Sequence, residues 1–529
     1  MSVPRRETMI RVKNLTVLLT LALSMIAIAA GARAQDKDAK PADKPAEAAP
    51  AAPPKEESSV TDHSIKIGGQ TIPYKATAAT ILLKNEKDEP TALVYFTAYT
   101  RSDAKDLSQR PISFVYNGGP GSASVWLHMG SFSPRRVITV NADATPPAPY
   151  KLSENQYCLL DKTDLVFVDP VGTGFSHAVG KAQDKDFWGV DQDVKSLAQF
   201  INTYTSRNSR WNSPKFLIGE SYGTFRSAAL SNYLQSHDGL YFNGIVLISS
   251  VLNLGTISFN AGEDMPYIFY LPSYTATAWY HKVLKDRPDN LTPFLDEARK
   301  YAQTDYADAL MKGSRLGDAE KAAVAKKLSR FTGLSEDYLV KANLRVNLPQ
   351  FMKELQRSRG LTTGRLDARF SGWSYDLLGE YAEYDPQDTS ITGPFTAAWN
   401  NYVRDELKFG QDKVYHTGSD EAGNNWDWKH RGAGDNFGFP GSPNVEGDLI
   451  QAMLTNPHLK IEVENGLYDL ATPFYATEYT MEHLGLPDKL QKNIHLQYYD
   501  AGHMMYLRDE DLAKLKSNIG SFIEGASKQ

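Results

Sequence analysis

The chain has 529 residues, of which 41% are hydrophobic and 23% charged, and this ordinary globular composition excludes disorder over most of its length. The formal net charge of −6 argues against nucleic acid as a partner. The single cysteine, Cys158, excludes an intramolecular disulfide and is interpreted as a packing residue.

Residues 1–34 have the pattern of a secretory signal peptide. Basic residues precede an apolar run from Leu15 to Ala32, and the small residues around Ala34 favour cleavage after it. An uncleaved membrane anchor is the alternative, because 18 apolar residues nearly span a bilayer. Cleavage would remove five basic residues and one acid, lowering the formal charge from −6 to −10. We therefore expect a periplasmic or secreted bacterial protein that makes no membrane contact after cleavage.

Residues 35–60 are predicted to be a flexible linker. They consist mainly of Ala, Pro and charged residues, with no aromatic residue that could anchor a core. The folded part of the chain is expected to begin near Thr61.

Seven short apolar runs predict strands that are buried on both faces, because their apolar character is continuous and does not alternate. Helical segments lie between them, which indicates a doubly wound α/β fold with a mainly parallel central sheet. The runs are residues 92–99, 112–117, 165–170, 215–220, 244–249, 459–464 and 494–499.

An insertion is expected at residues 255–445, which would divide the α/β core into a first part, 61–254, and a second part, 446–529. Its first half has helical spacing and good helix formers, with Ser335 as a predicted N-cap. The stretch that follows, to about residue 445, is rich in Trp, Tyr, Asn and Gly and is predicted to be irregular surface over a site. The insertion is interpreted as a cap.

The sequence GESYG places Gly219 and Gly223 around Ser221, directly after one apolar run and before a helical segment. A tight turn from strand to helix leaves no room for side chains at the flanking positions, so this pattern predicts a nucleophile elbow. Ser221 is therefore the candidate nucleophile.

A serine nucleophile needs a base and an acid, which in this topology follow it in the order acid, then histidine. His503 is the predicted base because it follows the strand 494–499 in a loop at the sheet's carboxyl edge. Asp469 is the predicted acid because it follows the strand 459–464 after a glycine turn. Asp500 is a rival acid, although three residues of chain make it a poor partner for the His503 ring.

The charge that develops on a substrate carbonyl oxygen needs backbone donors. One can come from Tyr222, directly after the nucleophile, and the other from the glycines of NGGPGS, residues 117–122. Ser124 stands where a dinucleotide-binding fingerprint would need its third glycine, which excludes that interpretation.

Five motifs, taken together and in this order, resemble the serine carboxypeptidases, peptidase family S10, of the α/β-hydrolase fold, in a bacterial-type member. They are NGGPGS (117–122), DPVGTGFS (169–176), GESYG (219–223), GLYD (466–469) and AGHM (501–504), and the resemblance spans about residues 65–525. It implies Ser221 as nucleophile, Asp469 and His503 as its partners, and the amides of Gly119 and Tyr222 as the oxyanion hole.

The resemblance also implies a subsite for the free C-terminus of a peptide substrate, built from Asn117, Gly118 and Glu220, with Met504 lining the pocket for the leaving residue. Two ionised carboxylates in contact repel, so Glu220 can bind a substrate carboxylate only while it is protonated. Arg226, one helical turn beyond the nucleophile, could add a positive charge there; the other interpretation is a structural ion pair.

Three positions depart from the family's pattern. Val115 stands where tryptophan is usual and Ser122 where cysteine is usual. Ser131 occupies the position of a second glutamate that often pairs with the one beside the nucleophile. A raised pKa of Glu220 is then less assured, and we expect activity at a less acidic pH than is usual for the family.

The preferred interpretation is an exported serine carboxypeptidase that acts through an acyl-enzyme. An acyltransferase or an esterase on the same fold, or an inactive binding module, remains open, as does the oligomeric state. The scattered histidines lack the spacing of metal ligands and no cofactor motif is present, so neither a metal nor a cofactor is expected.

Overall fold

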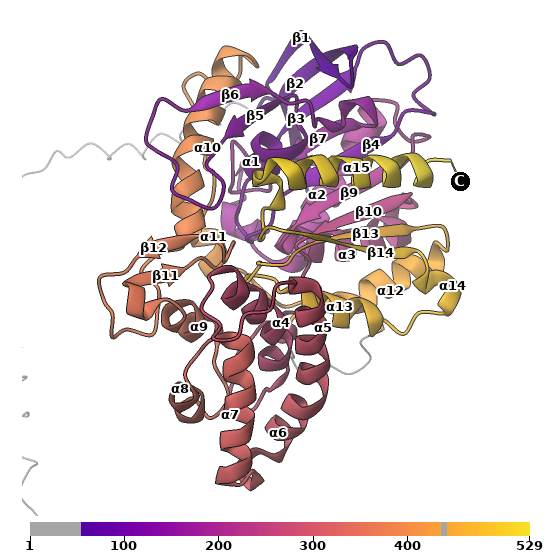
Figure 1. The fold of residues 1–529 in the computed structure, drawn as a ribbon. Helices are drawn as coiled ribbons and strands as arrows, with labels where there is room; N and C mark the ends of the chain where they lie inside the picture. The colour runs from indigo at the N-terminus through magenta and orange to yellow at the C-terminus, as the bar shows by residue number, and fades with distance from the viewer. Residues whose placement is uncertain (1–53, 435–441, 529) are drawn as a thin grey trace, which may run out of the picture. The chain divides into compact units, whose positions relative to one another are not determined.

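A ten-stranded mixed sheet is the centre of the computed structural model, which describes residues 54–434 and 442–528 (Figure 1). The strand order is β1-β2-β3-β7-β4-β9-β10-β13-β14, with β8 also paired to β3. Its strands are β1 (Ser58–Ile67), β2 (Gln70–Lys84), β3 (Pro90–Arg101), β4 (Ile112–Tyr116), β7 (Asp164–Val168), β8 (His177–Ala178), β9 (Lys215–Glu220), β10 (Gly244–Ile248), β13 (Lys460–Gly466) and β14 (Ile494–Tyr499). Two further sheets have two strands each: β5 (Arg135–Ile138) pairs with β6 (Lys151–Glu154), and β11 (Leu361–Thr363) pairs with β12 (Ser371–Trp373).

All seven predicted strands are present in this sheet, and the predicted mainly parallel arrangement is confirmed. Strands β7, β4, β9, β10, β13 and β14 are joined in parallel, whereas β1, β2, β3 and β7 are joined antiparallel. The β1–β2 hairpin was not predicted because β1 alternates between more and less exposed residues and contains Asp62, His63 and Lys66. Such a half-solvated strand lacks a continuous apolar run.

The predicted signal peptide and the linker up to residue 53 lie outside the described residues. The linker's predicted end is slightly too late, because β1 already begins at Ser58.

Helices cover both faces of the sheet, and the side chains of successive residues in one strand pack against opposite helical layers. Phe216 and Ile218 of β9 pack in one core cluster with helices α10 and α15, while Leu217 packs in another with α2, α3 and α12. The helices are α1 (Val125–Leu127), α2 (Val190–Arg207), α3 (Tyr222–Tyr233), α4 (Met265–Tyr280), α5 (Leu291–Tyr301), α6 (Ala307–Lys312), α7 (Asp318–Thr332), α8 (Glu336–Lys341), α9 (Leu348–Glu354), α10 (Pro386–Asp405), α11 (Asp420–Asn424), α12 (Glu446–Thr455), α13 (Phe474–Glu482), α14 (Asp488–Gln491) and α15 (Asp509–Ala526).

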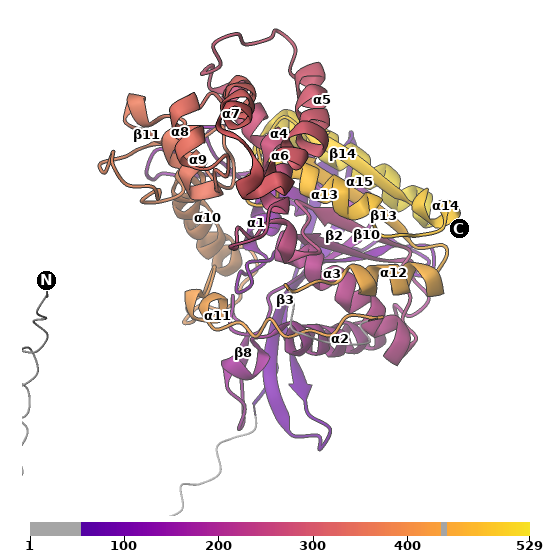
Figure 2. The ribbon, with the colours of Figure 1, turned by 90° about the horizontal axis from the view of Figure 1, so that it is seen from below.

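Helices α4 to α9 gather beside the sheet and have a core cluster of their own (Figure 2). Ser335 caps α8 as predicted, because its side chain accepts a hydrogen bond from the backbone of Tyr338. The stretch expected to be irregular is more regular than predicted, since it contains α10, whose Phe395 and Trp399 are buried against the sheet's helices. The proposed limits of a cap at residues 255–445 stay a prediction.

Within residues 54–434 and 442–528, none of the helices combines the length and the apolar character needed to cross a bilayer.

Candidate active site

The turn between β9 and α3 has the shape of a nucleophile elbow. Ser221 has a φ of 59°, which is rare for a residue with a side chain, and it is half-buried at the start of α3. A Cβ added to Gly219 would lie 2.2 Å from the carbonyl oxygen of Gly223, and one added to Gly118 would lie 2.4 Å from the amide nitrogen of Tyr222. These positions therefore need glycine because backbone approaches backbone there.

Thr224 braces the elbow from its helical side, a role that the sequence did not suggest. Its amide and its hydroxyl both donate to the carbonyl oxygen of Ser221, at 2.8 and 2.7 Å. The same hydroxyl accepts a hydrogen bond from the amide of Val251 at 2.9 Å. A bracing network of this kind holds the strained backbone at Ser221 in place.

Asp469 and His503, from the loops after β13 and β14, lie in contact. Nδ1 of His503 is 2.8 Å from Oδ2 of Asp469. Thr472 Oγ1 donates to that same oxygen at 2.7 Å, and the amides of Ala471 and Thr472 donate to Oδ1 at 2.7 and 2.9 Å. The carboxylate is thus fixed on all sides, and its contact with Nδ1 leaves Nε2 of the imidazole available for proton transfer.

The rival acid does not reach the histidine. The Asp500 side chain is largely exposed, and its nearest cation is Arg508, at 3.9 Å.

The pKa of His503 is raised. Burial, the largest influence, opposes the charged imidazolium, but the charge and hydrogen bond of Asp469, together with the charge of Glu220, outweigh it. A positive charge on this ring is therefore stabilised, as a general base requires after it has accepted a proton.

The loops of Ser221 and His503 converge at the end of β10. The amide of Ser221 donates to the carbonyl of Ile248 at 3.0 Å, and the hydroxyl of the next residue, Ser249, donates to the carbonyl of His503 at 2.7 Å. Within the described part of the chain, Ser221 Oγ makes no hydrogen bond to the imidazole. Such bonds are often long until substrate is present.

Two amides beside the elbow are available for an oxyanion. Gly119 is exposed and has a φ of +102°, and its neighbour Gly118 packs directly on Tyr222. Neither the amide of Gly119 nor that of Tyr222 donates a hydrogen bond to any other described residue. The resulting pair of free donors has the character of an oxyanion hole.

Asn117 and Glu220 form a buried pair next to Ser221. Asn117 Nδ2 donates to Glu220 Oε1 at 2.8 Å, while Asn117 Oδ1 accepts from the amide of Leu127 at 3.0 Å. Burial raises the pKa of Glu220 to about 7. The hydroxyl of Ser131, at the position where the family's pattern has a second acid, donates to the carbonyl of Leu127 at 2.6 Å.

Tyr506 also belongs to this group, and the sequence analysis missed it. Its buried hydroxyl lies beside both Glu220 and Asn117, although it makes no hydrogen bond of good geometry to either. Its position three residues after His503 was the only signal in the sequence, and nothing there indicated that its ring would reach Glu220.

Arg226 takes the structural role left open above. Its guanidinium is completely buried, pairs with Asp193 through Nε at 2.6 Å, and donates to the carbonyl of Asn117 at 2.7 Å. These contacts favour the structural ion pair over a role in the substrate pocket. Met504 is 6% exposed and belongs to the core cluster with α10 and α15, so the described contacts give it a packing role.

Over the described ranges, 54–434 and 442–528, no three or more His, Cys, Asp or Glu side chains are grouped so that they could hold a metal ion.

A model of the serine carboxypeptidase family matches residues 80–513. The chain is 29% identical over 161 residues to the pheromone-processing carboxypeptidase KEX1 of Saccharomyces cerevisiae, which is 29% of this chain and 21% of KEX1. It is 28% identical over 141 residues to the human retinoid-inducible serine carboxypeptidase, which is 26% of this chain and 28% of that protein. The aligned stretches thus span only 21% and 28% of the length of these relatives.

The crystal structure of the prohormone-processing carboxypeptidase KEX1 from Saccharomyces cerevisiae superposes with a TM-score of 0.53 at 19% identity, over 85% of this chain and 91% of that one. This likeness concerns the fold, which is of the α/β-hydrolase type.

Proposed function

Because the chain belongs to the serine carboxypeptidase family, we propose that it is an exported serine carboxypeptidase that releases C-terminal residues from peptides through an acyl-enzyme. One observation carries the proposal: the buried pair of Asn117 and Glu220 lies directly beside the elbow of Ser221.

In the first half of the reaction, Ser221 Oγ attacks the carbonyl carbon of the last peptide bond while His503 accepts the hydroxyl proton. Asp469 holds the imidazole and stabilises its positive charge. The negative charge on the carbonyl oxygen is received by the amides of Gly119 and Tyr222. His503 then gives its proton to the departing amine, and the C–N bond breaks to leave an ester on Ser221.

Water completes the second half. His503 accepts a proton from a water molecule, whose oxygen attacks the ester carbonyl, and it returns the proton to Ser221 Oγ as the acyl–oxygen bond breaks.

Recognition of the free C-terminus is assigned to Asn117, Gly118 and Glu220. A pKa of about 7 keeps Glu220 protonated in acidic and near-neutral solution, where it can donate a hydrogen bond to a substrate carboxylate. Once ionised, it would repel that carboxylate.

The test compares N-blocked dipeptides with their C-terminal amides, using Ser221→Ala as the control for contaminating activity. We expect wild-type turnover to favour the free carboxylate. Cleavage of simple esters without cleavage of either peptide would indicate an esterase, and failure of Ser221 to react with a phosphonate would indicate a binding role.

Export and a bacterial periplasmic location are part of the proposal and rest on the pattern of residues 1–34. N-terminal sequencing of the mature protein tests them, with a start at Gln35 expected; an intact N-terminus on a membrane-bound protein would contradict them.

A further inference from the structure

Two unpaired oxygens lie side by side in the candidate C-terminus subsite. Glu220 Oε2 and Tyr506 Oη are both buried and lie close enough to influence each other, and neither makes a hydrogen bond of good geometry to any described residue. Burying such a group without a partner destabilises the folded protein. A ligand with two polar atoms could give each of these groups a hydrogen-bond partner.

The absence of a side chain at Gly130 leaves room for the Tyr506 ring at this position. A Cβ added to Gly130 would lie 2.7 Å from Cε2 of Tyr506, so the ring packs on a backbone that has no side chain there. The neighbouring Ser131 turns its hydroxyl away, to the carbonyl of Leu127. The phenol, and not residue 131, is thus the second polar group beside Glu220.

We propose that Tyr506 Oη is a second hydrogen-bond donor to the C-terminal carboxylate of the substrate, acting beside Glu220. The inference rests on the proposed carboxypeptidase function and adds a specificity-determining residue to it. A carboxylate has two oxygens, and the two unpaired groups offer one donor to each.

A phenol is suited to this task for an electrostatic reason. Burial raises the pKa of Tyr506 well above its ordinary value, so the hydroxyl stays neutral and keeps its proton. A second carboxyl group would have to be protonated to do the same, since it would otherwise repel the substrate. With Tyr506, recognition depends on the protonation of one acid, Glu220.

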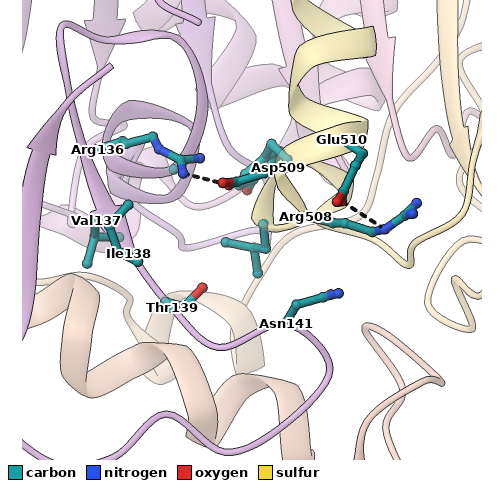
Figure 3. Close-up of a pocket in the computed structure, with 11 residues that line it drawn as sticks. Arg136, Val137, Ile138, Thr139, Asn141, Arg508, Asp509 and Glu510 are labelled. Atoms are coloured by element: carbon teal, nitrogen blue, oxygen red, sulfur yellow. Dashed lines mark hydrogen bonds and ion pairs between the residues drawn. The ribbon is translucent and has the colours of Figure 1, made fainter. Parts of the chain in front are cut away.

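Two arginines near Tyr506 are each paired with an acid. Gly130 and Tyr506 also line a cavity of about 260 Å³, whose other walls carry Arg136 and Arg508 (Figure 3). Arg136 pairs with Asp509 at 2.5 Å, and Arg508 pairs with Glu510 at 3.3 Å. The charges of these two guanidinium groups are therefore compensated by carboxylates of their own.

The experiment compares Tyr506→Phe with Tyr301→Phe, which removes another buried, unpaired phenol, in helix α5 of the helical region. For N-blocked dipeptides with a free carboxylate, Tyr506→Phe should lower kcat/KM by about 10- to 100-fold, the value of a hydrogen bond to a charged group. Turnover of an N-blocked amino-acid ethyl ester, which has no carboxylate, should stay within about twofold of wild type. Tyr301→Phe should change neither.

An equal effect of Tyr506→Phe on acid and ester, or no effect on either, would overturn the inference. A wild-type enzyme that does not favour free carboxylates would instead overturn the proposed function.

A binding measurement separates recognition from chemistry. In a Ser221→Ala background, calorimetric titration with the uncleaved dipeptide acid should give a Kd at least about tenfold weaker after Tyr506→Phe. The Kd of the matching amide should not change. Equal weakening of acid and amide would assign Tyr506 a merely structural role.

Discussion

The turns at the carboxyl ends of the strands and the helical region α4 to α9 obey different constraints. At and beside the turns, a Cβ on Gly118, Gly219 or Gly466 would lie 2.1–2.4 Å from a backbone atom of another residue. In the helical region, a Cβ on Gly317 would meet only the end of one flexible side chain, at 3.9 Å. The turns fix atomic positions for chemistry, whereas the helices need only bury their apolar faces.

The largest loss of activity is expected from a substitution at Asp469, which lies in one of the turns at the carboxyl ends of the strands. Asp469→Asn keeps the shape of the side chain but offers His503 a donor in place of an acceptor, which favours the wrong tautomer. We expect kcat to fall by about 10⁴-fold with little change in thermal stability. Steady-state kinetics on a blocked dipeptide, with a melting curve as the folding control, measure this. A loss below about tenfold would show that Asp469 does not orient the base.

A glycine pair tests the contrast directly. Gly118→Ala should push the backbone away from Tyr222 and lower kcat/KM by about 10²- to 10³-fold, because the oxyanion donors move. Gly317→Ala in the helical region should stay within about 0.5 kcal/mol of wild-type stability and leave activity unchanged. Similar effects of the two substitutions on activity would break the comparison.

A smaller loss of activity is expected when the hydrogen bond from Thr472 to Asp469 is removed. Thr472→Val removes the hydroxyl that donates to Asp469 Oδ2 but retains the amide bonds to Oδ1. Loss of one hydrogen bond to a charged group should reduce kcat about tenfold. Thr472→Ser, which keeps the hydroxyl, is the matched control and should retain most of the activity; if both variants behaved alike, the hydroxyl would have no part in holding Asp469.

The sequence predicted the features that depend on local composition and on the order of the motifs. Continuous apolar runs gave all seven strands, and the order of the motifs gave Ser221, Asp469 and His503, the last two of which lie in contact. The polar β1 strand was missed because its alternation does not resemble a buried strand. Helix α10 was missed because its composition, with several Thr, Asn and Asp residues and Pro394 inside it, does not favour a helix.

Long-range contacts explain the remaining differences at the site. Arg226 was left between two roles because spacing along a helix does not reveal that Asp193 of α2 lies opposite it. Tyr506 was missed because its contact with Glu220 depends on how the last strand's loop packs over Gly130. The missing acid at Ser131 suggested a weaker shift at Glu220, whereas burial, as the largest influence, raises the pKa of Glu220 to about 7.

The central claim is that protonated Glu220 binds the substrate's free carboxylate. Its most direct test is the pH dependence of kcat/KM for a blocked dipeptide, in wild type and in Glu220→Gln. For wild type, the value should rise as His503, whose pKa is raised, loses its proton, and should fall above about pH 7 as Glu220 ionises. Glu220→Gln has no ionisable group at this position, so the fall should disappear. A wild-type optimum near pH 4, or the same fall in both enzymes, would contradict the account.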